Sequence, residues 1–143
     1  MVRFKNRVLL VELIWKDGRI DETLTEANIQ SVLRESIALN FGDYGLGICL
    51  ASQQVKYYNP LTNLCIVRCG REQYKGVLAS MTTITTFRYR TVMMHLLHNG
   101  GTLASCQRAA IDHNRAVLQN MRLTQAQQKL ANEAEEKLQA LEL

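Results

Sequence analysis

The chain has 143 residues, of which 47% are hydrophobic and 21% charged, with a formal net charge of +4 at pH 7. This length suits one domain with its own core, and no segment reaches the roughly 18 uncharged apolar residues that cross a bilayer. The N-terminal segment MVRFKNRVLLVEL begins with basic residues and continues with apolar ones, as a secretory signal does. However, Glu12 interrupts the apolar run and no small-residue cleavage site follows, so we expect no secretory signal.

The first elements are a buried strand and an amphipathic helix. Residues 8–15, VLLVELIW, are apolar at both parities apart from Glu12, which indicates a central strand buried on both faces. The Thr-x-x-Glu sequence of Thr23 and Glu26 predicts a capping box. The apolar spacing that follows predicts a helix to about Phe41, ended by Gly42, and we expect residues 42–47 to form a loop.

A β-hairpin, a short helix and a further strand are expected next. Residues 53–59 alternate, with Val55 and Tyr57 predicted on one face, and residues 64–69 return after a turn at 59–63. Apolar spacing predicts a second helix over about 71–84 and a strand over 91–98.

Two helices close the chain. The third predicted helix starts near Thr102 or Leu103 and runs to about Met121. Thr124 and Gln127 form another potential capping box for a last helix with a narrow apolar seam. We therefore expect one α/β domain over residues 1–123 with a basic N-terminal arm. Residues 124–143 should form a C-terminal helix that packs on the domain or on a partner.

The order of elements predicts the fold. It reads β-α-β-β-α-β, the split βαβ or ferredoxin-like arrangement of an α+β sandwich, with two added helices. The handedness of crossovers places the first and third strands in the middle of an antiparallel sheet and the first two helices on one face. The third helix is the natural cover for the other face.

No catalytic or metal-binding pattern stands out. His95 and His98, three apart on a strand, are predicted on opposite faces, and Cys65 and Cys69 would lie roughly 13 Å apart, too far to share a metal. We expect reduced, mostly buried thiols. The sequence contains no phosphate-binding or dinucleotide fingerprint, and no recognisable nucleophile signature. We therefore expect no catalytic residues and no cofactor or metal bound by the protein itself.

Basic residues are unevenly distributed, which favours a polyanionic partner. Residues 54–123 hold nine basic and two acidic side chains, and residues 1–9 hold three basic and none acidic. Such segregation is typical of nucleic-acid binding, although a solvated surface of mixed sign is the alternative. Base stacking on the open sheet face is disfavoured because LCIVRC (64–69) has no aromatic residue.

Two short segments are candidate phosphate contacts. Arg3, Lys5 and Arg7 fall on one side of an extended arm. Gly100 and Gly101 let the backbone turn sharply before a helix, whose first N–H groups can hold a phosphate. Thr102 can cap that helix or donate to an oxygen, and Arg108 adds a charge along it. A solvated arm and a turn that merely needs glycine are the alternatives.

Four segments together resemble a known family. They are MVRFKNRVLLVEL at the start, the FGDYGLG loop, the hairpin QVKYYNPLTNLCIVRCGREQY and the turn GGTLASCQ. In this order over about residues 1–121 they are similar to the Pop-five subunit family of ribonuclease P and ribonuclease MRP. The resemblance implies a non-catalytic subunit that binds and stabilises a catalytic RNA, which removes 5′ leaders from precursor tRNA and, in the MRP particle, processes precursor ribosomal RNA. It further implies Mg²⁺ on that RNA, a TIM-barrel-like Rpp-thirty partner subunit and a location in the nucleus and nucleolus.

The resemblance also implies RNA-binding residues. The matching basic positions are those of the arm, Lys56 and Arg68 of the hairpin and Arg71 after it, with Gly100, Gly101 and Thr102 at the turn. Ala104 stands where family members often carry a basic residue, so Arg108 is expected to substitute for it.

Two other functions stay open on the residues. One is a small hydrolase of the acylphosphatase kind, for which arginines are present but a phosphate loop before the first helix is not. The other is a protein-only adaptor whose basic centre meets an acidic partner.

Overall fold

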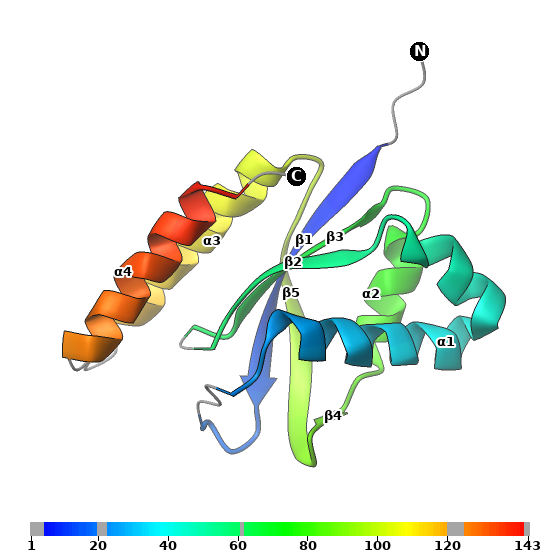
Figure 1. Cartoon of the computed structure of the whole chain (residues 1–143), viewed down its shortest axis with the longest axis horizontal. Helices are drawn as coiled ribbons and strands as arrows, with labels where there is room; N and C mark the ends of the chain where they lie inside the picture. The colour runs from blue at the N-terminus through cyan, green and yellow to red at the C-terminus, as the bar shows by residue number, and fades with distance from the viewer. Residues whose placement is uncertain (1–4, 20–22, 61, 120–124, 142–143) are drawn as a thin grey trace.

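The computed structural model describes residues 5–19, 23–60, 62–119 and 125–141, with only the backbone of residues 118–119 and 125–127. Nine elements follow one another in these described residues (Figure 1). They are β1 (Asn6–Trp15), α1 (Glu26–Leu50), β2 (Gln54–Asn59), β3 (Leu64–Gly70), α2 (Tyr74–Thr82), β4 (Thr86–Phe87), β5 (Arg90–Gly100), α3 (Leu103–Gln119) and α4 (Gln125–Gln139).

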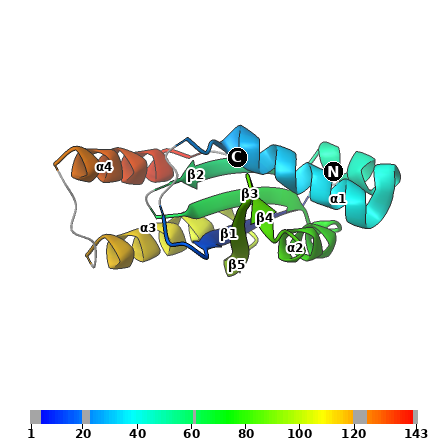
Figure 2. The same ribbon diagram turned by 90° about the horizontal axis from the view of Figure 1, so that it is seen from below.

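The strands form one antiparallel sheet in the order β2-β3-β1-β5-β4. This confirms the predicted fold class, with β1 and β3 inside the sheet. The sheet lies between the α1–α2 pair on one side and the α3–α4 pair on the other (Figures 1 and 2). The third helix therefore covers the second face, as the sequence indicated.

β1 supplies both cores because its side chains alternate between the two faces. Leu9, Val11 and Leu13 belong to the core under α1 and α2. Val8 and Leu10 belong to the core under α3 and α4. All five are at most 1% exposed, and full burial of one such side chain stabilises the fold by about 1.5–3 kcal/mol.

Two predictions for α1 are wrong. The N-cap is Thr25, whose side chain accepts a hydrogen bond from the Asn28 backbone N–H at 3.4 Å. Thr23 instead accepts a hydrogen bond from Arg88 at 3.0 Å. Gly42 breaks the helix with φ 74°, as expected of a helix end, but the chain resumes helical structure directly afterwards and continues to Leu50. The expected loop at residues 42–47 is therefore mostly helix.

A β-bulge changes the face of Tyr57. Val55 pairs with Val67 and Tyr57 with Ile66, so Lys56 is an extra residue in β2. One inserted residue inverts the alternation beyond it. Val55 therefore packs in the α1–α2 core and Tyr57 in the α3–α4 core, contrary to the prediction that they share a face.

A second bulge makes the prediction that His95 and His98 lie on opposite faces wrong. Leu10 pairs with His98 and Val11 with Leu96, which leaves Leu97 as the extra residue of β5. His95 pairs with Glu12. Because Leu10 and Glu12 lie on the same face of β1 and paired residues share a face, both histidines lie on the α3 face.

The remaining boundaries are close to those expected. The second helix, predicted over 71–84, spans Tyr74–Thr82, and the strand predicted over 91–98 spans Arg90–Gly100. The two-residue strand β4 was not predicted. α3 begins at Leu103, and Gln107 on it donates to the carbonyl oxygens of Leu138 and Leu141 at 2.6 and 3.0 Å, which joins α3 to the end of α4. Met121 and Thr124 lie outside the described residues.

Candidate nucleic-acid interface

The candidate interface lies at the end of the sheet where β1 begins and β3 and β5 finish, at the top of Figure 1. In the antiparallel ladders Asn6 pairs with Gly70, and Val8 pairs with Gly100. The Arg71 backbone N–H also donates to the Lys5 carbonyl at 2.9 Å. Segments near residues 5, 71 and 100 therefore meet in space, although about 95 residues separate the first from the last.

An open cavity of about 910 Å³ lies at this end of the sheet. Its described lining residues are Lys5, Asn6, Ile48, Ala51, Ser52, Arg68, Gly70, Arg71, Glu72 and Gln73. Three of them are basic and one is acidic, so these lining side chains carry a net positive charge. The Arg68 Nε donates to the Ser52 carbonyl at 3.2 Å, which holds the guanidinium against the cavity wall. A phosphate group fits this volume and this charge.

Three predicted site residues thus come together in one cavity. Lys5 and Arg71 are exposed and Arg68 is half-buried. Their side chains come from an arm, a turn and a strand, so no local pattern in the sequence could show their convergence. Converging cations of this kind bind successive phosphates of a nucleic-acid backbone.

Arg7 lies beside this cavity on the α2 side of the sheet. It pairs with Cys69, and its guanidinium carbon is 5.8 Å from the centre of the Tyr74 ring, within cation–π range. One guanidinium nitrogen, Nη1, would be 3.3 Å from a Cβ placed on Gly101. Arg7 is thereby held between α2 and the β5–α3 turn, which brings two of the predicted site residues together.

The β5–α3 turn needs its glycines for space. Neither Gly100 nor Gly101 has a left-handed φ, so the expected sharp glycine turn is not what selects them. A Cβ on Gly100 would lie 3.0 Å from His98 Nε2 and 3.3 Å from Ser105 Oγ, two atoms that hydrogen-bond at 2.7 Å. Close approach of the His98–Ser105 pair to the backbone is the physical reason for glycine here.

Thr102 acts as a helix cap. Its Oγ1 accepts a hydrogen bond from the Ser105 backbone N–H at 3.3 Å, as one of the two predicted roles requires. The hydroxyl is exposed at the start of α3, beside the segment that holds Arg7.

Two other predicted residues are not part of this cluster. Lys56 is the bulged residue of edge strand β2 and is not among the cavity's lining residues. Arg108 is exposed on α3, whose sheet-facing side chains include Cys106 and Ala110. Arg3 lies outside the described residues.

The second helical segment of α1 is the part of the cavity that the sequence analysis missed. Ile48, 43% exposed, and the following Ala51 and Ser52 line the cavity together with the basic residues. The apolar spacing of Leu46 and Cys49, three apart, was the available helical signal. The glycines at 42, 45 and 47 favoured a loop more strongly than this spacing favoured a helix.

The cysteines are free, buried thiols, as predicted. Burial raises the pKa of Cys69 and of Cys106 to about 12, and it also raises the pKa of Cys49 and Cys65. These thiols stay protonated at neutral pH, which suits packing and not nucleophilic chemistry.

Two further searches covered the described part of the chain. No group of three or more histidine, cysteine or acidic side chains is placed to hold a metal ion there. None of its helices combines the length and the apolar character that crossing a membrane requires.

A family model and several related proteins all point to the same protein family. The family model described as "Rpp14/Pop5 family" matches residues 7–111. A probable ribonuclease P/MRP protein subunit POP5 of Arabidopsis thaliana is 39% identical over 117 residues, which is 78% of each chain. The human ribonuclease P/MRP protein subunit POP5 is 34% identical over 122 residues, covering 82% of this chain and 75% of the human one. The Schizosaccharomyces pombe subunit is 30% identical and covers 86% and 95%.

A solved structure gives the same fold. A chain in the cryo-EM structure of yeast ribonuclease MRP aligns with a TM-score of 0.58 over 99% of both chains, at 11% sequence identity. At this identity the likeness shows the fold alone.

Proposed function

Because the chain belongs to the Rpp14/Pop5 family, we propose that it is a protein subunit of ribonuclease P, and of ribonuclease MRP, that binds and stabilises the RNA of these particles. In this proposal the RNA, with its Mg²⁺, removes the 5′ leader of precursor tRNA or processes precursor ribosomal RNA. The protein contributes cations and shape. Its protein neighbour is a TIM-barrel-like Rpp-thirty subunit, and it works in the nucleus and nucleolus.

The cavity lined by Lys5, Arg68 and Arg71 supports this proposal most directly. Folding RNA brings phosphates close together, and their repulsion opposes the compact shape. Cations fixed by a protein frame offset this repulsion without needing to be ordered first. Arg68 is fixed by its hydrogen bond to Ser52, while Lys5 and Arg71 are joined through their backbones.

The cavity residues are tested by removing charge from them. Lys5→Ala combined with Arg71→Ala should lower affinity for an in vitro transcribed ribonuclease P RNA roughly tenfold at 0.15 M salt. The slope of log affinity against log salt should become shallower by about 1.4–1.8, because two phosphate contacts no longer release counterions. Filter binding across a salt series measures both quantities.

A matched control removes the same charge elsewhere. Lys129→Ala combined with Lys137→Ala takes two exposed cations from α4 and should leave affinity and slope within twofold of the original chain. Equal effects of the two double variants would mean that only overall charge matters and would refute the cavity as the binding site.

The role in the particle is tested by what the chain carries and what it can do alone. Affinity purification followed by sequencing of bound RNA should recover ribonuclease P and MRP RNA. The purified chain, freed of RNA, should leave precursor tRNA intact. Cleavage by the RNA-free chain at the particle's rate would overturn the assignment of catalysis to RNA.

A further inference from the structure

The tip of the β4–β5 hairpin has an unusual composition. Arg88 and Tyr89 are its two loop residues, and both have positive φ, 49° and 67°. Two-residue hairpin loops of this handedness normally use Asn-Gly or similar pairs, because a Cβ disfavours the left-handed region. Arginine and tyrosine are poor choices for the turn itself, so their side chains need another explanation.

Tyr89 projects fully into solvent. Its relative exposure is 105%, the highest of the large hydrophobic residues whose side chains the structure describes. For comparison, Phe87 at the base of the same hairpin is 2% exposed and packs edge-on against Trp15, with ring centres 6.2 Å apart. The hairpin is therefore anchored by one aromatic ring and presents another.

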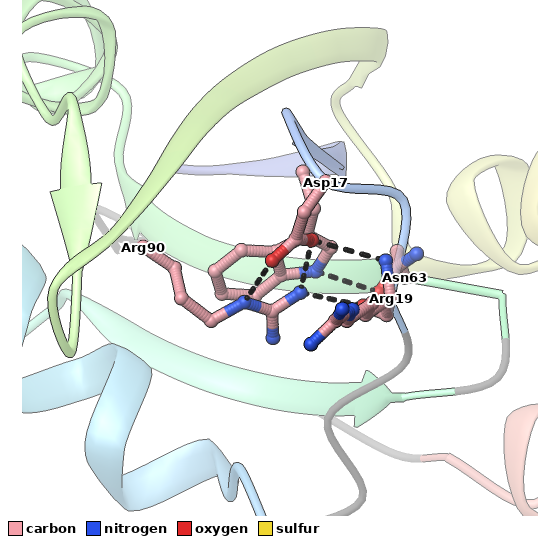
Figure 3. Close-up of polar contacts among 5 residues, drawn as sticks. Asp17, Arg19, Asn63 and Arg90 are labelled. Carbon is pink, nitrogen blue, oxygen red and sulfur yellow. Dashed lines mark hydrogen bonds and ion pairs between the residues drawn. The ribbon is translucent and has the colours of Figure 1, made fainter.

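The base of the hairpin is fixed by Arg90. Its guanidinium lies 4.1 Å from the centre of the Trp15 ring and donates through Nε and Nη2 to the two carboxylate oxygens of Asp17, at 3.0 and 2.6 Å (Figure 3). Nη2 also donates to the Arg19 carbonyl at 2.7 Å. The Tyr89 ring is thus mounted on a rigid support, which limits the ordering entropy that binding would cost.

Basic residues lie in the loop of the hairpin and on the turn beside it. The Arg88 side chain is held by a hydrogen bond to Thr23 at 3.0 Å. Lys16 and Arg19 are exposed on the neighbouring turn, whose backbone pairs with Thr91. Asp17 is the acidic residue of this turn among the residues described, and it forms an ion pair with Arg90. An exposed ring with one cation beside it in its loop and two on the neighbouring turn matches a single-stranded nucleic acid, whose bases stack while its phosphates meet the cations.

We propose that Tyr89 stacks on an unpaired RNA base, with Arg88, Arg19 and Lys16 contacting the flanking phosphates. This contact rests on the proposed function and adds a second RNA-binding point to it. β1 and β5 run between the two points, from the Lys5 cavity at one end of the sheet to the hairpin at the other. The protein thereby bridges two parts of one RNA.

The test distinguishes the effect of the Tyr89 ring from the effect of the turn conformation. Tyr89→Asn keeps a residue that accepts a left-handed φ and removes the ring, and Tyr89→Phe keeps the ring. Fluorescence anisotropy of the full chain with a 12-nucleotide single-stranded RNA should show roughly tenfold weaker binding for Tyr89→Asn. Binding by Tyr89→Phe should be unchanged within twofold. With the same RNA made abasic, the original chain and Tyr89→Asn should bind equally.

Two controls make the result specific. Tyr44→Asn removes another exposed tyrosine, on α1 and 83% exposed, and should leave binding unchanged. Tyr89→Asn should raise the melting temperature by about 2–4 °C, since it relieves a strained backbone. A gain in stability with a loss of binding shows that the ring serves recognition and not folding.

The possible failures are distinguishable. Equal binding by Tyr89→Asn and the original chain overturns the stacking proposal, even where Lys5→Ala with Arg71→Ala weakens binding as proposed above. If Tyr89→Asn weakens binding and Lys5→Ala with Arg71→Ala does not, the result supports stacking and rejects the cavity as a binding site. Unchanged RNA binding with loss of a co-purifying protein subunit would identify the tip as a protein contact and also overturn the proposal.

Discussion

At the scale of single residues, Arg90 shows how one side chain orders the end of the sheet away from the cavity. It combines an ion pair with Asp17, a cation–π contact with Trp15 and a hydrogen bond to a backbone carbonyl. Trp15 in turn donates its indole N–H to Asn63 at 3.1 Å (Figure 3). The bidentate geometry makes this pair stronger than a single exposed contact of the same charge.

The Asp17–Arg90 pair predicts acid sensitivity. The hydrogen bonds from Arg90 and from the Arg19 backbone lower the pKa of Asp17 from 3.8 to about 2. A depressed folded-state pKa adds stability above pH 4, which is lost as pH falls from about 4 to 2. The stability difference between the original chain and Asp17→Asn should therefore shrink over this range.

Urea unfolding followed through Trp15, the only tryptophan, measures this difference. Asp112→Asn, which removes an exposed carboxylate from α3, is the control and should show little loss of stability at pH 6. A difference for Asp17→Asn that stays constant from pH 6 to pH 2 would contradict the assignment.

At the scale of elements, the start of α1 and its interruption have different causes. Its start is fixed by a cap, since Thr25 satisfies an N–H group that the helix leaves open. Its interruption is fixed by Gly42, whose φ of 74° only glycine adopts easily. The segment beyond Gly42 matters for function because it forms one side of the basic cavity.

The cap assignment gives a stability prediction. Thr25→Ala should destabilise the chain by about 1 kcal/mol, because the first turn of α1 loses a hydrogen-bond acceptor. Thr23→Ala changes an exposed side chain that contacts Arg88 and does not cap the helix, and it should cost less than half of that. Chemical denaturation at pH 7 compares the two variants. A larger loss of stability for Thr23→Ala would contradict Thr25 as the N-cap and would support the capping box predicted from Thr23 and Glu26.

At the scale of the whole molecule, the fold depends on covering both faces of a sheet whose central strand is apolar on each side. α1 and α2 cover one face, and α3 with α4 covers the other. Leu138 of α4 is completely buried in the second core, and Lys137 beside it lies 3.4 Å from Glu26 of α1. The C-terminal helix is therefore packed on the domain and takes part in its core.

Truncation of Leu138 tests that role. Leu138→Ala should destabilise the chain by about 2–4 kcal/mol through lost burial and a residual cavity. Leu130→Ala, also on α4 but with a side chain 49% exposed, should cost clearly less. Thermal unfolding measures both, and equal small effects would show that α4 does not belong to the stable fold.

Local chemistry accounts for the features that were predictable. The apolar run of β1 and the spacing in α2 and α3 each follow from the period of neighbouring residues. The buried, reduced cysteines were predicted from spacing that suits no shared metal and from the absence of an expected secretory signal. The order of these elements then restricts the topology, because crossovers have one preferred hand. The candidate residues Lys5, Arg68 and Arg71 were found through resemblance and charge, and the structure places them in one cavity.

The sequence by itself thus determined the elements, their order and the general site of positive charge. The tertiary structure alone decided the two bulges at Lys56 and Leu97, the two-residue strand β4 and the helix beyond Gly42. The bulges and the helix beyond Gly42 form because a distant partner pairs with them or packs on them, and one inserted residue reverses every face beyond it. β4 is too short to show a pattern of its own, and it forms by pairing with the neighbouring β5. Local patterns carry no record of that partner, so only the folded chain shows which cations converge and which ring is left exposed.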